Sequence, residues 1–310
     1  MRSPICSGDH GRKMRRVTRN WQLYLFLLPA VAVFLVFNYY PMYGVQIAFR
    51  DFRANLGITG SPWVGLKHFE RFVSTSSFSL LLTNTLRISL MTLFLGFPIP
   101  ILFALLVNEI RFPKYRKLIQ TVSYAPHFIS TVVMVSMLII FLDKDYGIVN
   151  KAIGWFGLGP YDFMTKGSWF ASIYVLSNIW QNMGWDAILY IAALSSVDME
   201  LHEAAMIDGA SRLKRIIHIN IPSILPTITI MLILACGKVM SVGFEKVFLM
   251  QNPLNTSHSE IISTFVYKAG LQSAQYSFST AIGLFNSVVN LVLLLSVNAL
   301  AKKLGETSLW

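Results

Sequence analysis

Charged residues and cysteines are both scarce in this chain of 310 amino acids, and each scarcity excludes a class of protein. Only 13% of the residues are charged, against roughly 25% in a typical soluble domain. The two cysteines, Cys6 and Cys236, lie far apart, so no disulfide framework and no metal site is predicted. Hydrophobic residues reach 54%, and the missing charge therefore indicates apolar surface that never meets water.

Motifs of catalysis and of nucleotide binding are also missing. No nucleophile elbow, no HExxH zinc motif and no paired carboxylates occur, so we predict no catalytic residues. The pair Gly237-Lys238 resembles the end of a Walker A motif, but Val239 follows instead of serine or threonine. The chain is therefore predicted to be no enzyme and to bind no cofactor itself.

Six apolar runs, each long enough to cross a bilayer, divide the chain. They lie at about residues 21–37, 80–107, 118–142, 168–194, 224–250 and 278–301. The sequence thus predicts an all-α membrane protein with six transmembrane helices. Its predicted parts are a basic tail at 1–20, a transmembrane domain at 21–301 and a short tail at 302–310.

Lysine and arginine residues are more frequent, and lie in shorter segments, on the side of the membrane that holds the N-terminus. The positive-inside rule therefore places the N- and C-termini in the cytoplasm. Because the basic residues cluster at the ends of apolar runs, the net charge of +11 indicates membrane topology and no nucleic-acid partner. The predicted surroundings of the chain are membrane lipid.

Residues 198–222 form a polar stretch between two apolar runs and predict two short helices joined at a glycine. Asp198 suits the N-cap of the first helix, Gly209 can adopt the positive φ that ends it, and Ser211 suits the N-cap of the second. Such a loop is either a knob that docks on a soluble partner or an ordinary amphipathic loop, and these observations leave both open.

The spacing within this loop resembles that of a known family. Glu203-Ala204-Ala205 is followed after three residues by Gly209, and after nine more by Ile219-Asn220-Ile221-Pro222. This resembles the EAA loop of binding-protein-dependent ABC importer permeases, with isoleucine in place of the family's leucine. The resemblance implies a type I ABC importer permease fold and a cytoplasmic coupling-helix loop that docks on an ATPase. The implied coupling residues are Glu203, Ala204, Ala205, Asp208, Gly209, Ile219 and Pro222.

Polar side chains inside the apolar runs predict a translocation pathway. Amide groups and aromatic rings together suit a carbohydrate, although the same residues can form hydrogen bonds between helices. Lys238 could attract an acidic sugar, pair with Asp186 or extend toward the membrane interface. The predicted pathway residues are Asn178, Gln181, Asn182, Trp185, Cys236, Lys238, Met240 and Gly243.

Segments along almost the whole chain are similar to one branch of sugar permeases, the type that imports oligosaccharides derived from polysaccharides. The segments that show it include residues 21–25, 40–44, 60–69, 84–86, 126–130, 147–150, 242–245 and 304–306. Permeases of this kind bind sugar between the span before the loop and the span after it. The resemblance therefore assigns six of the pathway residues to the site, namely Gln181, Asn182, Trp185, Cys236, Met240 and Gly243.

The resemblance also implies a larger machine in a bacterial cytoplasmic membrane. Its other parts are a second homologous permease subunit, two ABC ATPase subunits that bind ATP and Mg²⁺, and an extracytoplasmic sugar-binding protein. The predicted function is ATP-driven import of an oligosaccharide, coupled through the EAA loop. The alternative is a secondary ion-coupled solute carrier, which the scarcity of intramembrane ionisable groups and of any visible inverted repeat disfavours.

Overall fold

The computed structural model describes residues 21–303, 308 and 309, and every regular element in that part of the chain is a helix. The tail predicted at residues 1–20 lies outside the described residues, and so does most of the predicted C-terminal tail. Two compact units divide the chain, Met1–Lys67 and His68–Trp310.

One apolar helical stretch, Trp21–Phe49, dominates the first unit. It combines α2 (Trp21–Phe34), the π-helical turn η1 (Leu35–Tyr39) and the 3-10 segment η2 (Tyr40–Phe49). Nearly all of its side chains are exposed, as expected for a helix whose surroundings are lipid or another membrane protein. After it, the Arg50 guanidinium donates hydrogen bonds to the carbonyl oxygens of Thr59 and Ser61, next to the short helix α3 (Gly57–Gly60).

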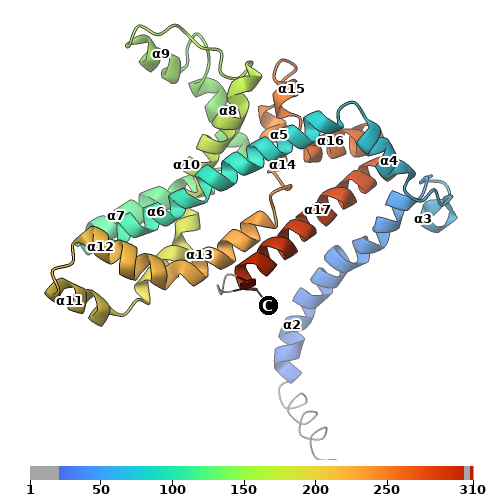
Figure 1. The fold of residues 1–310 in the computed structure, drawn as a ribbon. Helices are drawn as coiled ribbons and strands as arrows, with labels where there is room; N and C mark the ends of the chain where they lie inside the picture. The colour runs from blue at the N-terminus through green and yellow to red at the C-terminus, as the bar shows by residue number, and fades with distance from the viewer. Residues whose placement is uncertain (1–20, 304–307, 310) are drawn as a thin grey trace, which may run out of the picture. The chain divides into compact units, whose positions relative to one another are not determined.

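The second unit holds the remaining helices (Figure 1). In chain order these are α4 (Lys67–Ser74), α5 (Phe78–Met91), η3 (Thr92–Gly96), α6 (Pro98–Asn108), α7 (Pro113–Tyr124), η4 (Ala125–Phe128), α8 (Thr131–Phe141), α9 (Ile148–Gly154), α10 (Gly167–Ser195), α11 (Met199–Ile207), α12 (Arg212–Arg215), η5 (Ile216–Asn220), α13 (Ile221–Cys236), α14 (Phe244–Met250), α15 (Thr256–Ser259), α16 (Ile262–Tyr267), η6 (Lys268–Gln272) and α17 (Tyr276–Lys303). The loop that contains α11 and α12 lies at one end of this unit, and α4, α15 and α16 lie at the other.

Helix α10 is central to the packing of the second unit, because it contributes to two separate apolar cores. Tyr174 and Val175 in its first half pack in one cluster with residues of α5, α8 and α14. Ala187 and Leu194 in its second half pack in another cluster with α6 and α13. A helix that is packed along both halves of its length holds its side chains in fixed positions, which suits it to build a site.

Among the described residues, four helical stretches are long and apolar enough to cross a membrane, and a bent pair would make a fifth if it is counted as one span. These stretches are Trp21–Phe49, Phe78–Asn108, Arg212–Cys236 and Tyr276–Lys303, with the bent pair Pro113–Phe128 and Thr131–Phe141. Helix α10 is long enough at 29 residues, but it is not among them. Its polar side chains, which the sequence analysis assigned to the pathway, explain its lower hydropathy.

Two of the spans were predicted as continuous helices, and both are interrupted in the structure. The predicted span 118–142 bends by 97° between η4 and α8, and Ser130 caps the new helix by accepting a hydrogen bond from the Val133 N–H. The predicted span 224–250 ends as a helix at Cys236, and α14 begins only at Phe244.

Candidate functional site

The loop at residues 198–222 agrees with the prediction only in its first half and in its two caps. Helix α11 is short and capped, but the predicted second short helix is wrong, because α12 continues through η5 into α13 as one helical stretch, Arg212–Cys236. The Asp198 carboxylate accepts a hydrogen bond of 2.9 Å from the Glu200 N–H at the start of α11. The Ser211 hydroxyl accepts one of 3.4 Å from the Lys214 N–H at the start of α12. Each cap supplies an acceptor to an amide that has no partner within its own helix, and so defines where the helix begins.

Gly209 ends α11 in a Schellman motif. Its φ is +74°, its N–H donates to the Met206 carbonyl at 3.1 Å, and the Ala210 N–H donates to the Ala205 carbonyl at 2.8 Å. A side chain in that left-handed conformation costs about 1 kcal/mol or more, so glycine is the residue that this turn requires. The glycine of the loop pattern therefore has a conformational role, and the prediction that it ends the helix is confirmed.

The predicted coupling residues present an accessible surface. Glu203, Ala204 and Asp208 are exposed and Ala205 is half-buried. Large apolar side chains on the same short helix are also exposed, including Ile207, of which 87% is accessible. Ile219 lies half-buried in η5, and Pro222 lies exposed in the first turn of α13.

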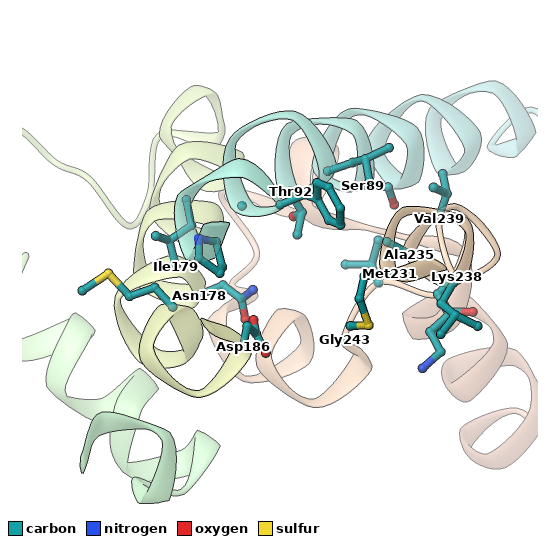
Figure 2. Close-up of a pocket in the computed structure, with 18 of the residues that line it drawn as sticks. Ser89, Thr92, Asn178, Ile179, Asp186, Met231, Ala235, Lys238, Val239 and Gly243 are labelled. Carbon is teal, nitrogen blue, oxygen red and sulfur yellow. The ribbon is translucent and has the colours of Figure 1, made fainter. Parts of the chain in front are cut away.

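A cavity of about 540 Å³ lies within the second unit, between α5, η3, α10, α13 and the segment after α13 (Figure 2). Ser89 and Thr92 line it from α5 and η3, and Asn178 and Asp186 line it from α10. Lys238 lines it from the segment after α13. In Figure 2, Asn178 and Asp186 lie on one side of the cavity and Lys238 and Val239 lie on the other.

Several polar groups in the cavity lining are available to a ligand. The hydroxyl of Ser89 is buried and makes no hydrogen bond within the described part of the chain. The side-chain oxygen of Asn178 accepts a hydrogen bond of 3.1 Å from Asn182. Neither Asp186 nor Lys238 is in an ion pair in the described residues, and both are exposed. A buried hydroxyl without a partner is costly, so a ligand hydroxyl would be a favourable partner.

Three of the eight predicted pathway residues line this cavity, namely Asn178, Lys238 and Gly243. Three others on α10 contact the bend of the third span instead. The Gln181 amide donates to the Ile129 carbonyl at 2.9 Å. The Asn182 side-chain oxygen lies 2.9 Å from His127 Nδ1, and the Trp185 ring stacks on the His127 ring at 4.4 Å between centroids.

The last two predicted residues lie beside the cavity without lining it. Cys236 is the C-terminal residue of α13. Met240 is only 2% exposed, and its side chain packs in the apolar core that contains Phe72 and Phe278. Whether any of the eight residues contacts a transported molecule stays a prediction.

Sequence reasoning missed five polar or aromatic residues of the cavity lining, which are Ser89, Thr92, Phe97, Tyr174 and Tyr190. Ser89 and Thr92 lie in a run of apolar residues where a single hydroxyl is common and gives no signal. Both tyrosines looked like core residues, and Tyr190 is indeed 3% exposed overall. Only the arrangement of α5 against α10 shows that these side chains share one cavity.

A helical unit in which a few polar side chains line a cavity between apolar helices is consistent with a transport permease. The chain belongs to the family of binding-protein-dependent transport system inner membrane components, whose profile matches residues 96–306. It is therefore a membrane-embedded permease with a type I ABC permease fold. This membership favours the first of the two predicted functions over a secondary ion-coupled carrier.

Relatives match the chain over nearly its whole length. The polygalacturonan/rhamnogalacturonan transport system permease protein YteP of Bacillus subtilis (strain 168) is 44% identical over 299 residues, which cover 96% of this chain and 93% of YteP. Protein LplB of the same organism is 42% identical over 309 residues, covering 99% of this chain and 97% of LplB.

A chain of known structure has the same fold. It belongs to a bacterial ABC transporter involved in the import of the acidic polysaccharide alginate, and its sequence is 40% identical to this one. The two superpose with a TM-score of 0.86 over 94% of this chain and 99% of the other. A second crystal structure, of a bacterial alginate ABC transporter in complex with an alginate pentasaccharide-bound periplasmic protein, gives a TM-score of 0.87 at 39% identity, over 95% of this chain and 99% of the other.

Proposed function

We propose that this chain is the membrane-spanning subunit of an ATP-driven importer of oligosaccharides derived from an acidic polysaccharide. The observation that carries the proposal is the cavity between α5, α10 and α13, which presents the unpartnered Ser89 hydroxyl together with the Asn178 amide and the Lys238 ammonium. Hydroxyl and amide groups suit the hydroxyls of a sugar, and the Lys238 ammonium suits a carboxylate. The polygalacturonan and alginate transporters to which the chain is similar support the same class of substrate.

The loop at residues 198–222 is the proposed docking element for an ABC ATPase subunit. It exposes the carboxylate of Glu203 beside accessible apolar side chains such as Ile207, a combination suited to a protein partner with a basic and apolar groove. The two helices that flank it, α10 and α13, both line the cavity. A displacement of the loop would therefore reach the cavity through two helices at once.

The complete machine includes partners that this chain requires. ATP and Mg²⁺ bind on two ATPase subunits, a second homologous permease subunit completes the pathway, and an extracytoplasmic binding protein delivers the sugar. In this arrangement α10 is the sixth membrane span, because it lies within the bundle and lines the cavity. The multi-pass chain lies in a bacterial cytoplasmic membrane with both termini and the docking loop in the cytoplasm, as the positive-inside rule favours.

Co-purification from detergent tests the docking assignment. The tagged chain, expressed with its partner subunits, is expected to recover an ATPase subunit and a second permease. Gly209→Pro should abolish recovery of the ATPase, because proline cannot adopt the φ of +74° on which the end of α11 depends. Glu203→Arg should have the same effect through charge reversal on the exposed face.

The matched control is Gly157→Pro, a proline at another glycine with positive φ, +73°, in the loop that follows α9. This variant should keep the ATPase while suffering the same kind of backbone strain. Recovery of the ATPase with Gly209→Pro, or its equal loss with both prolines, would contradict the docking role of the loop.

A further inference from the structure

The fifth apolar run is interrupted in the middle, and the interruption faces the cavity. Helix α13 ends at Cys236 and α14 begins at Phe244, so residues 237–243 form a non-helical linker. Five linker residues line the cavity, which are Lys238, Val239, Ser241, Val242 and Gly243. Backbone that leaves a helix at membrane depth loses its hydrogen bonds, and it is tolerated where it lines a polar cavity or is held by other groups.

Asn290 of α17 holds the linker at its centre. Its side-chain oxygen accepts a hydrogen bond of 2.9 Å from the Met240 N–H, and its amide nitrogen donates one of 2.9 Å to the Ser241 hydroxyl. One side chain thus satisfies a backbone amide that has left the helix and also fixes the neighbouring side chain. The buried Met240 side chain anchors the same point in the apolar core.

Tyr174 of α10 holds the linker at its end. Its hydroxyl accepts a hydrogen bond of 3.2 Å from the Gly243 N–H. A Cβ atom at residue 243 would lie 2.9 Å from that hydroxyl, so the close approach requires glycine. Tyr174 is itself held in place, because it is only 6% exposed and the Lys246 ammonium lies 5.2 Å from the centre of its ring.

Two carbonyl oxygens of the linker make no hydrogen bond within the described residues, whereas those of Lys238 and Gly243 accept from the Ser241 and Val247 N–H groups. In the part of the chain that the structure describes, no hydrogen bond reaches the carbonyls of Ser241 and Val242. A sugar presents many hydroxyl donors, and a free carbonyl beside a cavity is a matching acceptor. The linker therefore offers backbone acceptors that need no particular side chain.

We propose that Asn290 and Tyr174 are positioning residues that hold residues 237–243 out of the helix, so that the carbonyls of Ser241 and Val242 bind the hydroxyls of the transported sugar. This inference rests on the proposed function of the cavity as the sugar pathway. It explains why the linker has glycine at its end and an asparagine opposite its centre. Neither residue needs to touch the sugar for this role, although Tyr174 also lines the cavity.

The test uses the whole importer, reconstituted in vesicles with its ATPase, second permease and sugar-loaded binding protein. The measured quantity is the amount of oligogalacturonate imported per ATP hydrolysed. Asn290→Leu removes the hydrogen bonds from Asn290 to the linker. It should lower this ratio about fivefold for each hydrogen bond lost. Asn290→Asp, which keeps an acceptor for the Met240 N–H, should restore part of the ratio, and Ser241→Ala and Tyr174→Phe should give smaller losses.

Asn286→Leu is the matched control, since Asn286 lies one turn away on α17 and forms no hydrogen bond to the linker within the described residues. It should leave the ratio unchanged. A purely structural role of Asn290 would lower the amount of assembled importer and leave the ratio intact, which would overturn the proposal. Should Asn290→Leu fail to assemble, an unchanged ratio in both Ser241→Ala and Tyr174→Phe would overturn it as well. An absence of import by the unmodified importer would instead contradict the proposed function itself.

Discussion

Glycine residues show most directly how single positions shape this permease, and they do so for different physical reasons. Gly209 is needed for its positive φ, since a Cβ there would meet no other atom within 4 Å. Gly184 has an ordinary helical position in α10, but a Cβ there would fall onto the backbone carbonyl of Ser123 in α7. The first glycine defines a turn, and the second permits two helices to touch.

Gly184→Ala should destabilise the folded permease by about 1–3 kcal/mol, because a methyl group forces α10 away from α7. Thermal unfolding of the purified protein in detergent measures the effect. Gly283→Ala on α17 is the matched control, since nothing lies within 4 Å of its Cβ position. That substitution should be neutral or stabilising by up to ~1 kcal/mol, and equal melting temperatures for the two variants would contradict the close contact of α7 with α10.

At the scale of elements, α10 carries amide side chains with two different roles, lining the cavity and bonding to a neighbouring helix, which its sequence does not distinguish. Asn178 points to the cavity, whereas Gln181 donates to the carbonyl of Ile129 at the bend between η4 and α8. Both are amides in the same polar run, and both suit a sugar equally well by composition. The sequence predicted that this run is special, but the direction of each side chain depends on helices that are distant in the chain.

Replacing these two amides should therefore give different results. Asn178→Leu should reduce sugar uptake about tenfold, the order expected when a ligand hydroxyl loses a hydrogen-bond partner, with little change in thermal stability. Gln181→Leu should instead lower stability by ~1–3 kcal/mol, because the partly buried Ile129 carbonyl loses its donor. Sugar uptake and melting temperature are measured on both variants. Lost stability with Asn178→Leu and lost uptake with Gln181→Leu would instead place the sugar path on the face of α10 that contacts η4.

The segment between α14 and α17 is held by a polar network around Glu260. Its carboxylate lies 2.6 Å from the Lys268 ammonium and accepts a hydrogen bond of 2.8 Å from the Thr264 hydroxyl. The Glu260 side chain is 11% exposed, so water screens the pair only in part. Short helices of this kind need such contacts, because four to six residues cannot form a stable helix alone.

Glu260→Ala should lower the free energy of unfolding by about 1–3 kcal/mol. This is somewhat less than the loss expected for a fully buried pair, since the Lys268 side chain is partly open to water. Glu260→Gln, which keeps the hydrogen-bond acceptors without the charge, should cost less. Limited proteolysis of the segment at residues 251–276, together with the melting temperature, reports the loss. Glu245→Gln, at an exposed glutamate of α14, serves as the control and should change neither.

Sequence patterns anticipated the helices and caps of this permease better than its breaks. The caps at Asp198 and Ser211 and the turn at Gly209 depend on residues close in sequence, and all three were predicted. The interruption at residues 237–243 depends on Asn290 and Tyr174, which are about 50 and 70 positions away. A local pattern cannot show such partners, so the fifth span was predicted as one continuous helix.

At the scale of the whole molecule, the proposed docking loop and the cavity belong to the same pair of helices. Helix α10 leads from the cavity to the loop, and α13 leads from the loop back to the linker at residues 237–243. Packed helices move largely as rigid bodies, so an ATPase that pulls on α11 would change the shape of the cavity. This connection is the structural basis of the proposed ATP-driven import.

Uptake of oligogalacturonate into vesicles that contain the whole importer tests the proposed ATP-driven import most directly. We expect import that requires ATP and the loaded binding protein, is lost with Gly209→Pro, and is unaffected when ionophores dissipate the ion gradients. Import that persists without ATP and collapses with the ion gradient would contradict the proposal of an ATP-driven importer.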